Sequence, residues 1–161
     1  EDRKTLLSIG KIHEILQVPG IDEVFVGLND LSLGYGHKFM FVPLADGTVE
    51  RLSKIFADAN LPFGFGGIAS LGKGMLPSEC VIREHYRLGS GCTILSRSFC
   101  DVHKITDLDQ VRAIFTKGIR DIRDLERECR EREAEPDYFE ENRDAVSERV
   151  RIICQGLLAR V

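Results

Sequence analysis

Several features that mark membrane, secreted or nucleic-acid-binding proteins are missing from this sequence. No apolar run approaches the roughly 20 residues that span a bilayer, so no membrane-spanning helix is expected. The formal net charge is −4, which provides no basic field to attract nucleic acid or an anionic membrane. The first residues, EDRKTLLS, are charged and lack the apolar segment of a signal peptide. We therefore expect neither a membrane nor a nucleic-acid partner.

Common catalytic and metal-binding motifs are also absent. The five cysteines form no C-x-x-C pair, so their spacing does not indicate a zinc site. Free thiols of this kind are typical of a reducing compartment, and we expect the protein in the cytoplasm. There is no G-x-x-x-x-G-K-[ST] phosphate loop, no H-E-x-x-H zinc motif and no G-x-S-x-G nucleophile elbow. These absences argue against the enzyme classes that such motifs define.

What remains is an alternation of strands and helices in a chain of 161 residues, of which 43% are hydrophobic. This length is enough for one domain with a sizeable core. Apolar spacing and turn residues predict strands over 23–28, 63–68 and 92–96, a long loop over 29–45, and helices over 4–17, 46–57, 78–88, 106–133 and from 136 onward. Ser78 and Thr106 are expected to cap the helices that follow them, and Gly89 suits a helix C-terminus.

This element order predicts an α/β fold with a parallel sheet and right-handed crossovers. Two architectures fit: a small doubly wound sheet, or part of a (β/α)₈ barrel, which normally takes about 250 residues. Three strands cannot complete a barrel. We expect a single domain over 1–161, with the strand–helix units in 1–104 and the C-terminal helices in 105–161.

Polar residues and glycines gather at the three predicted strand ends, in GLNDLSLGYG, GFGGIASLGKG and ILSRSFCD. In parallel α/β folds, functional groups collect where strands end. Asp30 follows the first strand, and a carboxylate there suits a hard cation such as Mg²⁺. Nearby glycines let backbone N–H groups approach an anion. The alternative is that Asp30 is a turn residue or helix cap whose carboxylate binds backbone N–H groups.

Two further features at these ends have more than one explanation. Gly66 and Gly67 interrupt the second strand, which indicates close approach of a ligand or of neighbouring backbone, or tight packing at a barrel rim. Among the four histidines, His37 lies in the loop after the first strand and is the acid/base candidate. His13 and His85 fall within predicted helices and are expected at the surface or an interface.

The segment VPGIDEVFVGLNDLSLGYG, residues 18–36, resembles the VxGVDxxFIGxxDLSxxxG segment of the HpcH/HpaI aldolase and citrate lyase family. The preceding HEILQVPGID is also similar to the lead-in of that family. The resemblance covers about Thr5 to Gly36 and continues more loosely, in element order, to near Ser98. The family belongs to the phosphoenolpyruvate/pyruvate-binding barrels, so the resemblance implies the C-terminal part of a (β/α)₈ (TIM) barrel. The three strands would be its sixth, seventh and eighth.

The resemblance implies a metal-dependent carbon–carbon lyase acting on a pyruvate-type keto acid or a related acyl substrate. Mg²⁺ or Mn²⁺ would bind the enolate form of the keto acid. Asp30 stands at the position of the metal-ligating Asp in the family's D-L-S motif. The residues expected to hold the substrate are Gly27, Leu28, Asn29, Gly66 and Gly67.

The second metal ligand departs from the family's pattern. That ligand is a Glu, usually followed by Thr, at the end of the preceding strand. Here Lys4-Thr5 stands at that pair, and Glu1 lies three residues upstream. Either Glu1 is the second ligand after a longer turn, or the ligand is lost. The family's substrate-binding Arg and acid/base His come from earlier strands, so this chain is expected to be inactive by itself.

Two other functions fit the same residues, and the last helix suggests an assembly. The chain could be a non-catalytic barrel relative without the metal, or a phosphate-binding barrel enzyme that uses the glycines of the later strand ends. The last helix carries an apolar stripe of Phe139, Val146, Val150, Ile153 and Leu157. In the resembled family, C-terminal helices commonly pack on a neighbouring subunit, so we expect a homo-oligomer formed through these helices.

Overall fold

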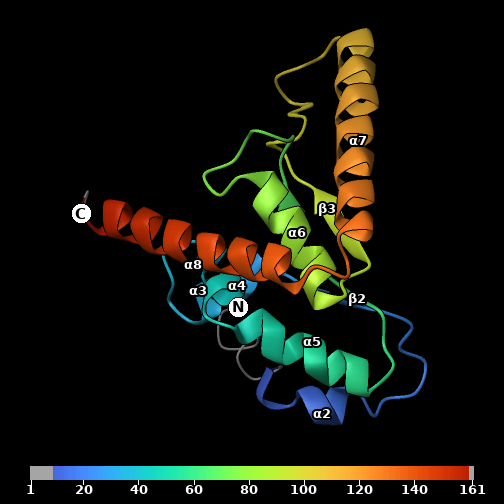
Figure 1. The fold of residues 1–161 in the computed structure, drawn as a ribbon, viewed down its shortest axis with the longest axis vertical. Coiled ribbons are helices and arrows are strands. Elements are labelled where there is room, and N and C mark those ends of the chain that lie inside the picture. The colour runs from blue at the N-terminus through green and yellow to red at the C-terminus, as the bar shows by residue number, and fades with distance from the viewer. Residues whose placement is uncertain (1–8, 160–161) are drawn as a thin grey trace.

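The computed structural model describes residues 9–159, which form a three-stranded parallel sheet and a set of helices (Figure 1). The strands, in the order β1-β2-β3, are β1 (Val24–Val26), β2 (Phe63–Ile68) and β3 (Cys92–Leu95). The helices are α2 (Ile12–Ile15), α3 (Leu28–Gly34), α4 (Val42–Ala45), α5 (Thr48–Asp58), α6 (Ser78–Leu88), α7 (Leu108–Glu131) and α8 (Pro136–Leu158). The predicted α/β class with a parallel sheet is confirmed.

The strand register places the ends of all three strands at one edge of the sheet. Val26 of β1 pairs with Phe65 of β2, and Ile68 of β2 pairs with Leu95 of β3. The β2–β3 ladder is irregular between Gly64 and Gly67. Because the strands are parallel, the segments that follow them start at the same edge. We call this edge, residues 27–30, 66–70 and 95–98, the strand-end rim.

Of the helices that lie between the strands, α5 and α6 cover the same face of the sheet. Phe63 and Phe65 are two residues apart on β2, so their side chains point to the same side. The ring of Phe56 on α5 lies 5.4 Å from the ring of Phe63, and that of His85 on α6 stacks at 3.8 Å on Phe65. We call this the covered face. Helices α5 and α6 are amphipathic and bury their apolar sides against it.

The opposite face of the sheet is largely uncovered by the described residues, and we call it the open face. Phe25 pairs with Gly64 and therefore points away from Phe63 and Phe65. Ile94 lies two residues after Cys92, the partner of Gly64, and points the same way. Phe25 is 40% exposed and Ile94 is 56% exposed. Large apolar side chains on both outer strands of this face thus remain in contact with solvent.

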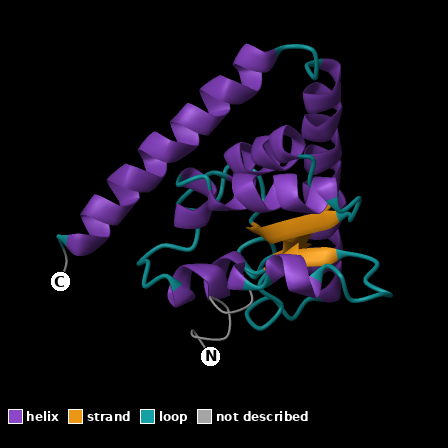
Figure 2. Ribbon diagram, turned by 90° about the horizontal axis from the view of Figure 1, so that it is seen from below, coloured by secondary structure: helices purple, strands orange, loops and turns teal. Residues whose placement is uncertain are grey.

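Helix α8 is anchored at its N-terminal half and projects beyond the rest of the chain at its C-terminal end (Figures 1 and 2). In the predicted apolar stripe, Phe139, Val146 and Val150 are buried, and Ile153 and Leu157 are half-buried. The stripe is therefore largely covered within the chain, whereas Ile152 and Leu158, which lie outside it, are 53% and 62% exposed. No helix within residues 9–159 is both long and apolar enough to cross a bilayer.

Hydrogen bonds to buried polar groups fix the position of α8. The amide of Asn142 donates to the Cys80 carbonyl and to the Glu84 carboxylate, at 3.0 and 2.9 Å. Glu84 is fully buried and also pairs with Arg87 at 2.7 Å. Arg87 in turn reaches Glu50 on α5 at 2.9 Å. This network joins α5, α6 and α8, and it satisfies a carboxylate that burial would otherwise destabilise.

Several sequence predictions need correction. Residues 29–45 are not a loop: they contain α3 and α4, and α3 forms because Leu28 and Leu31 are buried in the core. Thr106 does not cap α7, since the carboxylate of Asp107 accepts the N–H of Asp109 at 2.9 Å. Ser78 is the first residue of α6, and its hydroxyl instead accepts the N–H of Ala69. The bounds of β2 are as predicted.

The remaining helix limits agree more closely with the sequence pattern. Gly89 ends α6 with a positive φ of 72°, the conformation expected of a glycine at this position. Helix α8 begins at Pro136, as predicted. Of the helix predicted over 4–17, only α2 (Ile12–Ile15) and the residues next to it lie in the described part of the chain.

Candidate functional site

Hydrogen bonds and packing join the three segments of the strand-end rim. The N–H of Ser96, after β3, donates to the carbonyl of Ile68 at the end of β2, at 2.9 Å. The hydroxyl of Ser70 donates to the carbonyl of Phe99 at 3.0 Å. Leu28, after β1, packs against Gly66 of β2. The rim is therefore one connected surface, and the residues predicted at the three strand ends come together there.

Asp30 lies in the first turn of α3, directly after β1. Gly27 is the N-cap of this helix, so Asp30 is its third residue. The carboxylate folds back over Gly27, where an added Cβ atom would lie 2.9 Å from Oδ2 of Asp30. Asp30 is exposed, and within residues 9–159 its carboxylate accepts no hydrogen bond. The capping explanation for Asp30 is thus not realised, and its oxygens are accessible to a cation.

The neighbours of Asp30 contribute in different ways. The side chain of Leu28 is fully buried, so only its backbone is available to a substrate. Asn29 is exposed next to Asp30. Gly27 leaves the space into which the Asp30 carboxylate folds, and a side chain at this position would displace that carboxylate. The substrate-binding roles predicted for these residues remain predictions.

Gly66 and Gly67 have packing roles that explain their small size. Gly66 has a φ of +67°, and a Cβ atom there would lie 3.1 Å from Cδ1 of Leu28. A larger residue would therefore be strained in backbone and side chain. Gly67 is less restricted, because its Cβ would lie at ordinary distances of 3.5 Å from Ile94 and Ser96. These contacts favour the rim-packing explanation, and ligand binding by the two glycines stays a prediction.

His37 follows α3 and is paired with an acidic side chain. Its Nε2 lies 3.7 Å from Oδ2 of Asp46, which is longer than a hydrogen bond but within ion-pair distance. The N–H of His37 donates to the carbonyl of Ser32 at 2.8 Å and fixes the backbone. Its ring lies 5.7 Å from that of Tyr35. The Asp46 carboxylate beside the imidazole is placed to restrict the orientation of the ring.

The fit of the rim to a divalent metal depends on Asp30. Glu1, the predicted second ligand, lies outside the described residues. Between residues 9 and 159, no three side chains of metal-ligating type lie close together. Mg²⁺ is often held by only one or two carboxylates, with the other positions taken by water and substrate oxygens. Asp30 fits one such position.

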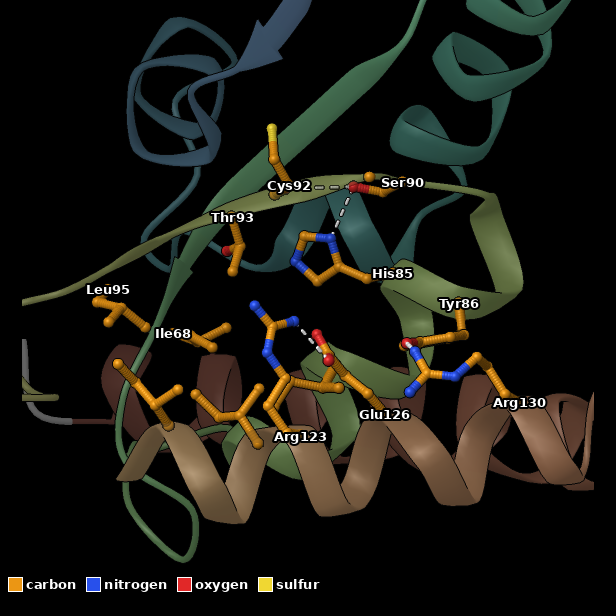
Figure 3. A pocket seen from close by; sticks show the side chains of 14 residues that line it. Ile68, His85, Tyr86, Ser90, Cys92, Thr93, Leu95, Arg123, Glu126 and Arg130 are labelled. Carbon is orange, nitrogen blue, oxygen red and sulfur yellow. Dashed lines mark hydrogen bonds and ion pairs between the residues drawn. The ribbon is translucent and has the colours of Figure 1, made fainter. Parts of the chain in front are cut away.

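Sequence reasoning missed a second group of functional side chains, which lines a cavity between β3, α6 and α7 (Figure 3). His85, expected at the surface or an interface, is instead only 6% exposed and stacks on Phe65. Burial lowers the pKa of His85 to about 4. One signal was available in the sequence: His85 follows the apolar residues Val81 and Ile82 at helical spacing.

The chemically active groups therefore lie in two separate places: the strand-end rim with Asp30, and the cavity with His85. The rim is where the sequence predicted a site, and the cavity lies under the helices of the covered face. Comparison with models of protein families, with curated proteins and with solved structures found no match. The function of the rim is therefore argued from its residues and from the resemblance of residues 18–36.

Proposed function

We propose that this chain forms the last three strand–helix units of a (β/α)₈ barrel of the HpcH/HpaI aldolase and citrate lyase type. The proposed activity is metal-dependent cleavage of a carbon–carbon bond in a pyruvate-type keto acid or a related acyl substrate. The observation that carries this proposal is the exposed carboxylate of Asp30, within the D-L-S motif, where β1 ends.

The arrangement of strands and helices supports the barrel part of the proposal. The strand order follows the chain, β1-β2-β3, and α5 and α6, the two longest helices between the strands, pack on the covered face. Doubly wound sheets instead place helices on both faces. In a barrel, all helices lie outside and the other face lines the interior. The open face, with Phe25 and Ile94, is then the side that further strands would enclose.

Few residues of the described chain have a role in the proposed reaction. A bound Mg²⁺ or Mn²⁺ acts as a Lewis acid that stabilises negative charge on the substrate oxygens. Asp30 supplies a carboxylate oxygen to hold the cation. The resemblance implies that backbone amides at this strand end hold the substrate carboxylate, and Leu28 and Asn29 occupy that place here. His37, held near Asp46, is the acid/base candidate.

Binding of Mn²⁺ to the Asp30→Asn variant tests this proposal. The substitution removes one charge with little change in shape, and we expect Mn²⁺ affinity, measured by calorimetry, to fall at least about tenfold. Asp22→Asn is the matched control, because Asp22 is exposed and lies just before β1, at the opposite end of the same strand. Its affinity should equal that of the parent chain. Equal affinities for the Asp30→Asn variant and the parent would exclude Asp30 as a ligand.

Binding measurements of the same kind distinguish the two alternative functions. A non-catalytic relative predicts that the parent chain itself does not bind Mn²⁺. A phosphate-binding enzyme predicts that inorganic phosphate binds and that Gly67→Ala weakens this binding. Gly67 is the better choice for this variant, since Gly66→Ala would strain a positive φ and disturb the packing of Leu28.

A further inference from the structure

The cavity between β3, α6 and α7 is large enough for a small ligand. Its volume is about 590 Å³, which is within the range of small-molecule sites. It lies on the covered face of the sheet, and Asp30 does not line it. Its use therefore does not depend on the proposed lyase function.

The two sides of His85 in this cavity differ in polarity (Figure 3). Tyr86 and Arg130 lie on one side and satisfy each other, since Arg130 donates to the hydroxyl of Tyr86 at 3.0 Å. Ile68 and Leu95 lie on the other side, toward which the ring edge with Nε2 is turned. Nε2 is thus the polar atom that the imidazole presents to the apolar side of the cavity.

Hydrogen bonds at the other nitrogen fix the tautomer of His85. Its Nδ1 lies 2.7 Å from the hydroxyl oxygen of Ser90. The Ser90 hydroxyl donates to the carbonyl of Cys92 at 3.4 Å, so its oxygen accepts from His85 and Nδ1 carries the ring proton. Burial lowers the pKa of His85 to about 4, which keeps the ring neutral at pH 7. Nε2 is therefore unprotonated and can only accept a hydrogen bond.

Nε2 of His85 is buried without a hydrogen-bond donor. The residue is 6% exposed, and Nε2 has no partner among the described residues. Thr93 also lines the cavity, but its hydroxyl donates to the carbonyl of Phe65 at 3.2 Å. A buried polar atom without a partner is costly, so a ligand that brings a donor to Nε2 gains affinity.

Arg123 determines which kind of donor fits. Figure 3 shows its guanidinium group reaching into the cavity from α7, below the ring of His85. Its Nη1 donates to Glu126 at 2.6 Å, and its other N–H groups make no hydrogen bond within residues 9–159. A hydroxyl can donate to Nε2 and accept from Arg123, whereas a carboxylate cannot donate and an ammonium group repeats the charge of Arg123. The Arg123 side chain is mostly exposed, so it can move to admit such a ligand.

We propose that this cavity binds a small uncharged alcohol. The hydroxyl donates to Nε2 of His85 and accepts from Arg123, and the apolar part of the ligand lies against Ile68 and Leu95. Two contributions favour binding: burial of the apolar part, and a hydrogen bond to an atom that otherwise has no partner.

Titration of the parent chain with 1-hexanol at pH 7, followed by ¹⁵N NMR of the His85 imidazole, tests this proposal. We expect saturable binding with a Kd of about 1 mM. The Nε2 signal should move upfield as this atom accepts a hydrogen bond, while Nδ1 stays protonated. The isomer 1-methoxypentane has no donor, so it should bind at least about fivefold more weakly and leave the Nε2 signal in place. Hexanoate, which also lacks a donor at this pH, should bind more weakly than 1-hexanol.

Four variants assign the contacts. His85→Phe keeps a ring against Phe65 but removes Nε2, so it should bind 1-hexanol and 1-methoxypentane equally. His103→Phe, at an exposed position, should keep the preference for 1-hexanol. Arg123→Met should weaken 1-hexanol binding about fivefold, because it removes a charged donor. Arg127→Met, exposed on the same helix and outside the cavity, should bind as the parent does.

Several results would overturn the proposal. Equal affinities of the parent chain for 1-hexanol and 1-methoxypentane would show that no donor reaches Nε2. Equal affinities of the Arg123 and Arg127 variants for 1-hexanol would remove Arg123 from the site. A free protein with a protonated Nε2, or an Nε2 signal that does not move at saturation with 1-hexanol, would contradict the assigned role of His85.

Discussion

Both faces of the sheet carry large apolar side chains, but the surroundings of these side chains differ. On the covered face, Phe65 is fully buried against His85, whereas Phe25 and Ile94 on the open face remain 40% and 56% exposed. Full burial of such a side chain stabilises a fold by about 1.5–3 kcal/mol. Within the described residues, the large apolar side chains of the covered face are therefore buried more completely than those of the open face. In the proposed barrel, further strands would enclose the open face and bury these side chains.

Truncation of one phenylalanine on each face is the most direct test of the difference in burial between the two faces. Phe65→Ala should lower the free energy of unfolding by about 3–5 kcal/mol, because it opens a cavity in the core. Phe25→Ala should cost only about 1–2 kcal/mol, since 40% of that residue is already exposed to solvent. Urea unfolding followed by circular dichroism measures both. Similar losses for the two variants would mean that the open face is covered in solution.

His85 makes the covered face sensitive to pH. Burial lowers its pKa to about 4, from 6.5 in the unfolded chain. Between these two values the unfolded state binds a proton that the folded state does not, so stability falls as the pH falls. We expect His85 to lower the free energy of unfolding by about 3 kcal/mol when the pH falls from 7 to 4.

Urea titrations of two histidine variants isolate this contribution. His85→Gln should show a flatter dependence of the free energy of unfolding on pH over this range. His103→Gln is the control, because His103 is exposed after β3 and should leave the dependence unchanged. A His85→Gln variant with the pH dependence of the parent would show that the buried imidazole titrates normally.

Sequence and structure agree best where local signals and tertiary packing coincide. The bounds of β2 were predicted because its aromatic and glycine residues lie between clear turn signals, Asn60-Leu61-Pro62 and the loop after Ile68. Helix α3 was missed because it is short and rich in turn-forming residues. Its helical conformation depends on burying Leu28 and Leu31, and Leu28 packs against Gly66, a residue far away in sequence.

Of the two candidate sites, the sequence likewise predicted one and missed the other. The sequence identified Asp30 from its place after a strand and from the resemblance, and the structure places it at the expected edge of the sheet. The cavity between β3, α6 and α7 could not be predicted, since it joins Arg123 and Arg130 of α7 to His85 and Tyr86 of α6. That contact depends on how a long charged helix packs, and the periodicity of α7 alone does not identify the residues opposite it.

The smallest expected effect on folding comes from a substitution at the exposed apolar end of α8. This end and the open face are the two candidate surfaces for self-association. We expect the homo-oligomer to form through α8, because Ile152 and Leu158 lie on a helix that projects beyond the rest of the chain. Ile152→Glu should weaken association at least about tenfold by burying a charge at the interface. Its effect on the unfolding of each subunit should stay within about 0.5 kcal/mol.

Ile94→Glu provides the matched comparison on the open face, because Ile94 is about as exposed as Ile152. It adds the same charge to a strand of the sheet and should leave self-association unchanged if α8 is the interface. Sedimentation equilibrium of the parent chain and the two variants measures this difference. Dissociation by Ile94→Glu with no effect of Ile152→Glu would assign the interface to the open face. The uncovered strands would then be closed by a second copy of the chain, since unpaired edges and apolar faces of sheets favour such pairing.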